Sequence, residues 1–205
     1  MLALLTTWRL TAISFLVAFV IGTFVTVLRI SPVNVLRGVA NVYIQIFRNI
    51  PGAALLIVLV YALPYLNIVF SYRTCVLIAT SLIPSAFCSE YLISGINTIK
   101  PGQIEAARSL GFSFFKIVRF IIIPQALRTS VLSLTNLLIA TMLTTALASQ
   151  VPMNPRDLTG IVDYINTHDT GGIMAFIISA ALYCATAVAI GQLGNWIDRK
   201  VRIVR

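Results

Sequence analysis

Long stretches without a charged side chain dominate this sequence and limit what it can fold into. Such stretches run over 10–28, 49–72, 129–155 and 170–197, and a further one over 74–99 is interrupted only by Glu90. A helix needs about 20 apolar residues to cross the hydrocarbon core of a bilayer. Only 10% of the residues are charged, against roughly 25% in a water-soluble domain. We therefore predict one all-α integral membrane domain over 1–205, with five spans at about 10–28, 50–70, 74–97, 125–149 and 171–197.

The first span also has the position of a cleavable signal peptide. A signal peptide has an apolar core of about 7 to 15 residues and small residues at its cleavage site. The segment here is longer, lacks an A-x-A-like end and precedes Arg29 and Arg37. We interpret it as a retained helix, followed over 29–52 by an amphipathic segment on the cytoplasmic side.

The basic residues predict an orientation. Five spans place the two termini on opposite sides of the membrane. With the C-terminus inside, all but three of the fifteen Lys and Arg residues are cytoplasmic, the exceptions being Arg9, Arg73 and Arg156. This follows the positive-inside rule, so we expect an N-out, C-in topology. The net charge of +9 is then explained by orientation and by contact with anionic lipid, and no nucleic-acid partner is needed.

Cysteine and histidine give no sign of a metal site. Cys75, Cys88 and Cys184 lie in apolar spans at spacings that form no metal-ligand pattern, and we expect them to pack as small apolar side chains. The only histidine, His168, lies in an acidic connector over 150–172 and is interpreted as a surface residue. That connector is either a contact surface outside the membrane or a plain polar link.

The segment between the third and fourth spans is too long to be a turn, because two to eight residues usually join neighbouring helices. Pro101 suits the first position of a helix and Gly111 the position just beyond its end, which predicts a helix at about 101–110. Ile104, Ala107 and Leu110 share one face of this helix. On these residues two interpretations stay open: the helix docks in a groove of another protein, or it lies on lipid headgroups.

Residues 105–124 read EAARSLGFSFFKIVRFIIIP. Their pattern closely resembles the E-A-A-x3-G-x9-I-x-L-P loop of ABC importer permeases, with Ile123 in place of the leucine. IQIFRNIP, GINTIKPGQIEAARSLG and NLLIA are similar to permeases for polar amino acids, of the histidine, glutamine and glutamate type. RISPVNVLR looks most similar to the glutamate-type members. The resemblance covers most of the chain from Arg29 onward.

The resemblance implies a type I ABC importer permease fold in which the 101–110 helix is the coupling helix. It implies a pair of ABC ATPase subunits, a second permease subunit and an extracytoplasmic binding protein as partners, in a bacterial cytoplasmic membrane. ATP and Mg would be held by the ATPase, and this chain, which has no G-x-x-x-x-G-K-[ST] sequence, would bind no cofactor and catalyse no reaction. The residues implied in ATPase contact are Gln103, Glu105, Ala106, Ala107, Arg108, Leu110, Gly111 and Pro124.

Glu90 is an ionisable residue inside a span, and such residues usually mark a transport route or a buried partner. Three interpretations stay open. Glu90 contacts the ammonium group of an amino acid, or it pairs with a cation from a second permease, or it is protonated or close to the inner interface, near Lys100. By the family resemblance, the substrate route includes Glu90, Asn136, Thr144 and Thr145.

Two positions depart from the family pattern. Ile93 stands where the family often has an arginine, and Leu143 stands where it often has a lysine. Because part of the charged set is missing, we expect this chain to pair with a different permease in a heterodimer, not with a second copy of itself.

These observations favour the permease subunit of an ATP-driven, binding-protein-dependent importer of polar amino acids, of the glutamate or glutamine type. An ion-coupled secondary transporter is one alternative, although such proteins usually contain repeated halves. A non-transport membrane assembly protein or membrane enzyme is another. Uptake without any ATPase subunit would indicate the secondary transporter. Turnover of a substrate by the isolated chain would indicate the enzyme or assembly protein.

Overall fold

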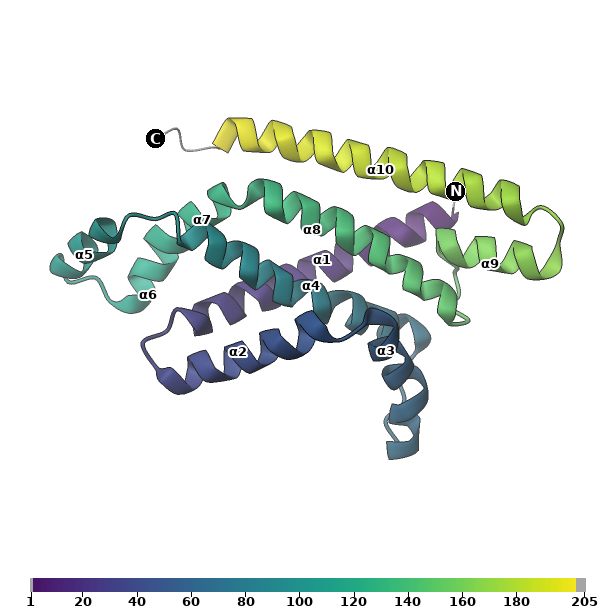
Figure 1. The fold of residues 1–205 in the computed structure, drawn as a ribbon, viewed down its shortest axis with the longest axis horizontal. Helices are drawn as coiled ribbons and strands as arrows, with labels where there is room; N and C mark the ends of the chain where they lie inside the picture. Colours follow the sequence, from purple (N-terminus) through teal and green to yellow (C-terminus); the bar gives the residue numbers. More distant parts are fainter. Residues whose placement is uncertain (1, 202–205) are drawn as a thin grey trace.

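The computed structural model describes residues 2–201, and every regular element among them is helical (Figure 1). Arg202 and Arg205, two of the basic residues that support the expected orientation, lie outside this range. Four helical segments within it are long and apolar enough to cross a membrane. They are α1 (Leu2–Arg29), α4 (Tyr72–Ile96), α8 (Val131–Thr144) with its 3-10 extension η4 (Thr145–Gln150), and α10 (Gly172–Val201).

A further span exists only as two arms that meet at 99°. The first arm is α2 (Asn34–Asn49), and the second comprises α3 (Gly52–Ile57), a π-helical turn η1 (Val58–Ala62) and a 3-10 turn η2 (Leu63–Leu66). Pro51 explains the bend, because a proline disfavours helical geometry in the residue before it, and Ile50 is extended with φ −80° and ψ 129°. Counting the two arms as one gives the expected five spans; otherwise there are four.

The position of α2 differs from the expected cytoplasmic segment. Its buried residues Ala40 and Ile44 pack with Val25 of α1 and Ala86 of α4, and Tyr43 makes a 2.6 Å hydrogen bond with Ser85. Val25 belongs to the predicted first span, so α2 returns alongside that span instead of lying beneath it. Only Ala40 and Ile44 of this helix are buried, and the apolar residues Val35, Val39, Val42 and Ile46 are exposed.

The contact between α1 and α4 forms the centre of the bundle. Ser14 pairs with Thr80 at 2.7 Å, and Thr26 donates to Ser89 at 3.1 Å. Both partners advance in the same direction along the chain, so the two helices run parallel. A Cβ on Gly22 would lie only 2.6 Å from Cβ of Cys88. Small residues and interhelical hydrogen bonds are the usual means by which helices associate in a membrane.

Two short helices mark opposite ends of the bundle (Figure 1). The helix α5 (Pro101–Ser109) lies at one end, followed by α6 (Phe114–Ile117), the π-helical turn η3 (Val118–Ile122) and α7 (Ile123–Thr129). The helix α9 (Leu158–His168) lies at the other end. α10 runs along the side of the molecule, and only 6% of its apolar membrane-crossing stretch is buried inside the protein.

A fully buried carboxylate fixes α9 on the bundle. Asp157 is 0% exposed and caps the helix by accepting hydrogen bonds from the backbone N–H groups of Gly160 and Thr159, at 2.9 and 3.3 Å. Burial raises the pKa of Asp157, although these N–H groups and Tyr183 act in the opposite direction. The hydroxyl of Thr7 in α1 accepts from the Leu158 N–H at 3.1 Å. These contacts connect α9 to α1 and α10.

Gly22→Leu should separate α1 from α4, because the added side chain meets Cys88 and the backbone of Ser85. We expect the free energy of unfolding, measured by denaturant titration in detergent, to fall by about 2 to 3 kcal/mol. The matched control is Gly38→Leu in α2, where a Cβ meets nothing within 4 Å and the expected change is within about 0.5 kcal/mol. Equal effects of the two substitutions would contradict this account of the α1–α4 contact.

Candidate functional site

The helix α5 has a defined start and stop. Pro101 occupies its first turn, where a missing backbone N–H costs nothing. At its other end, the N–H groups of Gly111 and Phe112 donate to the carbonyls of Arg108 and Ala107, at 2.9 and 3.0 Å. This is the Schellman arrangement, which needs a left-handed residue just past the helix, and Gly111 has φ +77°. The helix therefore ends in a sharp turn leading to α6.

The apolar residues of α5 do not all face the same way. Ala107 is 4% exposed and packs, with Ile104, into a cluster containing Ile117, Val118 and Ile122. Leu110, expected on the same face, is 77% exposed. The outward face instead carries polar and small residues. The exposed members of the predicted coupling set are Gln103, Glu105, Ala106, Arg108, Leu110 and Gly111.

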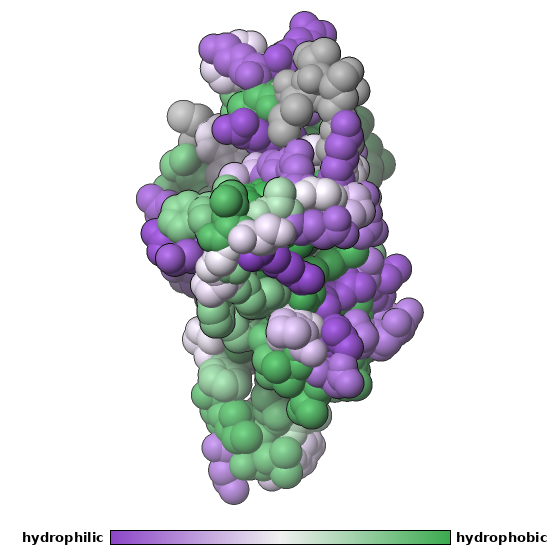
Figure 2. Space-filling model, turned by 90° about the vertical axis from the view of Figure 1, so that its left-hand side faces the viewer, coloured by the Kyte–Doolittle hydropathy of each residue, from purple (hydrophilic) through white to green (hydrophobic). Residues whose placement is uncertain are grey.

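A contact between α5 and α7 also defines this end of the bundle. Gln125 of α7 donates its side-chain amide to Oε1 of Gln103 at 2.8 Å, which ties the two helices together. Pro124 is exposed in the first turn of α7. Figure 2 views the molecule from this end and shows hydrophilic side chains at the top and along the sides, with hydrophobic ones over much of the centre and lower half. The predicted coupling residues are thus gathered on one end, except Ala107, which faces inward.

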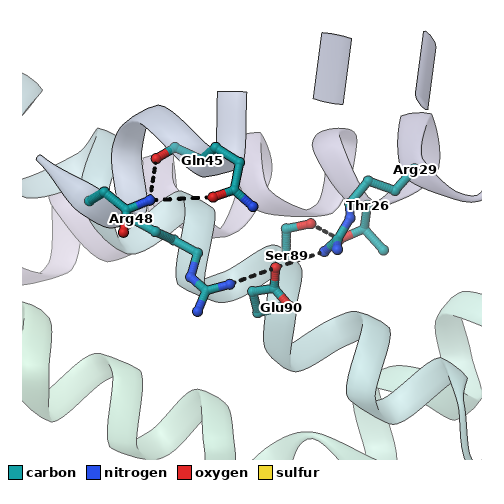
Figure 3. Close-up of polar contacts among 7 residues, drawn as sticks. Thr26, Arg29, Gln45, Arg48, Ser89 and Glu90 are labelled. Atoms are coloured by element: carbon teal, nitrogen blue, oxygen red, sulfur yellow. Dashed lines mark hydrogen bonds and ion pairs between the residues drawn. The ribbon is translucent and has the colours of Figure 1, made fainter. Parts of the chain in front are cut away.

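A second polar site lies where α1, α2 and α4 meet (Figure 3). Glu90 of α4 accepts a hydrogen bond from Nη1 of Arg48 at 3.1 Å, and Nη1 of Arg29 lies 3.3 Å from the same oxygen, Oε1. The guanidinium of Arg48 also lies over the Phe87 ring, 5.8 Å from its centre. We call Arg29, Arg48 and Glu90 the charged cluster. It joins the ends of α1 and α2 to the middle of α4.

The charged cluster changes the interpretation of Glu90. Its carboxylate pairs with two cations of its own chain, where one sequence interpretation placed the cation on a second permease. Nη1 of Arg48 donates to Oε1, and Nη1 of Arg29 lies near the same oxygen without a hydrogen bond. A contact of Glu90 with the ammonium group of a substrate stays a prediction. The sequence interpretation used Arg29 and Arg48 only for membrane orientation. Glu90 was the sequence feature that could have indicated this pairing, because a carboxylate inside a span needs a partner.

The other predicted route residues divide between two environments. Asn136 is exposed on α8, and Thr144 is partly exposed on the same helix. Thr145 is 0% exposed, and its hydroxyl donates to the Met142 carbonyl at 2.6 Å. An exposed amide in an uncharged span is unfavourable against lipid, because lipid tails offer no hydrogen bond. The Asn136 face of α8 therefore suits a protein partner or a water-filled route, whereas Thr145 is buried in the bundle. The part that these residues play in a substrate route stays a prediction.

Glu90→Gln should destabilise the chain by leaving Arg29 and Arg48 side by side without an acid. We expect a loss of about 1 to 2 kcal/mol in unfolding free energy, below the value for a fully buried pair because Arg48 is partly exposed. The double variant Glu90→Gln/Arg48→Gln should lose less than the sum of the single variants. Glu105→Gln, on the exposed face of α5, is the control with no expected loss. Strict additivity would argue against the cluster.

Within residues 2–201, no three His, Cys, Asp or Glu side chains lie close enough together to hold a metal ion. The polar groups of the two sites are amides, hydroxyls, arginines, the paired carboxylate of Glu90 and the exposed carboxylate of Glu105. This set is suited to binding and to transmitting movement. It does not supply a nucleophile with an adjacent base.

Comparison with known proteins agrees with the resemblance in the sequence. The family model for "Binding-protein-dependent transport system inner membrane component" matches residues 14–203. The glutamate transport system permease protein GluC of Corynebacterium glutamicum is 36% identical over 94% of this chain and 90% of its own length. GluC of Corynebacterium efficiens is 34% identical over 90% of this chain and 86% of its own length.

Solved structures show the same fold. The crystal structure of an amino acid ABC transporter with histidines superposes with a TM-score of 0.86, at 28% identity, over 97% of this chain and 92% of that chain. The MetNI methionine ABC transporter superposes with a TM-score of 0.81 at 23% identity, over 96% of this chain and 93% of that one, which supports the fold alone. The chain therefore belongs to the family of binding-protein-dependent inner membrane transport components, as a non-enzymatic transmembrane permease subunit of an amino-acid ABC transporter whose ATPase is a separate subunit.

Proposed function

We propose that this chain is the permease subunit of an importer that takes up polar amino acids of the glutamate or glutamine type. The α5 end faces the cytoplasm and the α9 end faces outward. The substrate class is supported by the names of the related glutamate permeases. The observation that carries the importer mechanism is α5 itself: a short helix at the basic end of the bundle, with defined ends and a polar outward face, available to an ATPase subunit.

The packing behind α5 supports a role in coupling. Ile104 and Ala107 contact a cluster that also includes Val27 and Ile30 from the end of α1 and Ile96 from the end of α4. A displacement of α5 by the ATPase would therefore reach two spans through this cluster. Coupling of this kind requires an element with two arrangements that both sites bias. In this proposal, that element is the helical bundle, which opens alternately to either side.

The surfaces at the other end suit the remaining partners. A polar pocket of about 310 Å³ opens beside α9, with Arg156, Asp163 and Tyr164 among its lining residues, and an extracytoplasmic binding protein would deliver substrate on this side. The arm formed by α3 and η2 projects from the bundle (Figure 1) and exposes Tyr61 and Tyr65. A second permease subunit would cover this arm. The absent charges at Ile93 and Leu143 favour a different permease over a second copy.

Cysteine crosslinking tests the ATPase contact. Ala106 is exposed on α5, whereas its neighbour Ala107 is 4% exposed. In a Cys184→Ser background, which removes the exposed native cysteine, we expect Ala106→Cys to crosslink to cysteines placed in the groove of a co-expressed ABC ATPase. Ala107→Cys should crosslink poorly. Equal yields from both positions, or none from either at normal expression, would refute docking through this face.

Uptake tests the turn that ends α5. Gly111→Asp introduces a side chain at φ +77°, where most residues with a Cβ are strained by about 1 to 2 kcal/mol. With ATPase and binding protein present, we expect uptake of labelled glutamate and glutamine to fall at least tenfold while the protein stays in the membrane. Gly102→Ala, in the same helix and with nothing within 4 Å, should retain uptake. Normal uptake by Gly111→Asp at equal expression would count against the coupling role.

A further inference from the structure

The charged cluster contains one more positive than negative charge. Arg29 and Arg48 both pair with Oε1 of Glu90, at 3.3 and 3.1 Å. All six acidic residues of the chain lie within the described residues, and the other five lie in or beside α5, α9 and the last turns of α10. None of those five forms an ion pair with the cluster. The chain therefore leaves one arginine of this cluster without a counterion of its own.

Arg48 is the more accessible of the two arginines, whereas Nη1 of Arg29 is buried and makes no hydrogen bond to any described residue. The Arg48 side chain is 42% exposed, against 19% for Arg29. Among residues 2–201, Arg48 takes part in a single hydrogen bond, through Nη1. A guanidinium has five N–H donors arranged as a planar fork, so Nε and Nη2 are left to bind another group. Stacking over Phe87 and pairing with Glu90 hold the plane of this fork in place.

The surroundings of Arg48 are polar along one face of α2. Asn41, Gln45 and Asn49 follow each other at four-residue spacing, and all three are exposed or partly exposed. Asn49 donates its amide to the Gln45 carbonyl at 2.6 Å. These amides offer both donors and acceptors within one or two helical turns of Arg48. A charge with such neighbours is costly against lipid, so this face lines a polar route or a polar interface.

We propose that Arg48 binds the α-carboxylate of an amino acid on its way through the permease. Glu90 and Arg29 act as positioning residues that hold the Arg48 guanidinium, and the amides of α2 contact the polar groups of the substrate. A free arginine fork binds a carboxylate through two parallel, charge-assisted hydrogen bonds. This inference rests on the proposed function. It assigns the substrate contact to a cation, whereas the family resemblance placed Glu90, Asn136, Thr144 and Thr145 on the substrate route.

The first test uses the unmodified transporter, assembled with its ATPase and second permease in lipid nanodiscs. Labelled L-glutamate and L-glutamine are bound in the absence of binding protein, and unlabelled competitors are added. We expect the α-methyl ester of L-glutamine, which lacks the negative charge, to compete at least tenfold more weakly than L-glutamine. If the α-ester competes equally well, the inference is overturned. If L-glutamine competes only weakly against labelled L-glutamate, Arg48 binds the side-chain carboxylate of glutamate instead, and the inference is also overturned.

The second test compares variants in uptake with binding protein present. Arg48→Gln should raise KM at least tenfold, whereas Arg37→Gln on the same helix, the control for loss of one charge, should not. Arg48→Lys retains the charge but not the fork, so it should raise KM by a smaller factor; this variant decides the matter if Arg48→Gln does not assemble. Because Glu90 positions Arg48, we expect Glu90→Gln to raise KM by a larger factor than it lowers kcat.

The outcomes separate this inference from the proposed function. Unchanged KM in both Arg48 variants, with amino-acid uptake by the wild type, refutes the inference alone. Loss of permease assembly with unchanged KM in the surviving complex would show that the carboxylate belongs to the second permease, which also refutes it. Wild-type transporter that takes up none of a panel of labelled amino acids refutes the proposed function itself.

Discussion

The close contact between α1 and α4 is the constraint on which the rest of this structure depends. Lipid provides no hydrophobic force to drive helices together, so their association relies on close packing and on hydrogen bonds between side chains. Gly22 permits the approach, and the Ser14–Thr80 and Thr26–Ser89 pairs fix its register. Because the helices are parallel, their ends lie together at the α5 end of the bundle. α2, α7 and α5 all pack on or near that pair of ends.

The same contact explains the location of the charged cluster. Thr26 and Ser89 bring the last turn of α1 against α4, so Arg29 and Glu90 become neighbours. The bend at Pro51 ends α2 at the point from which Arg48 reaches the same carboxylate. One acid is thereby shared by three elements. A cluster of this kind is sensitive to the relative positions of the helices, which is appropriate in a protein whose family function requires the helices to move.

Several parts of the fold were predictable because they depend on local chemistry. Pro101 and Gly111 delimit a helix through their own backbone preferences, and the structure has α5 at Pro101–Ser109. Uncharged stretches indicated the long helices because the bilayer sets their length. The sequence predicted the second span less well, because the chain bends by 99° at this point. A hydropathy pattern reports composition and gives no information on the direction of a helix. The inward orientation of Ala107 was also missed, because an alanine suits a buried face and an exposed one equally.

The sequence by itself determined that the chain is a membrane permease of the ABC importer type, and it predicted which residues form the coupling loop. Hydropathy, basic-residue asymmetry and the EAA spacing are properties of short segments, so they can be read without a structure. Only the tertiary structure decided which residues meet Glu90, which face of α5 is exposed and which of the route residues are buried. Those facts depend on contacts between helices far apart in the chain, such as Arg29, Arg48 and Glu90, and on the angle at which the helices cross.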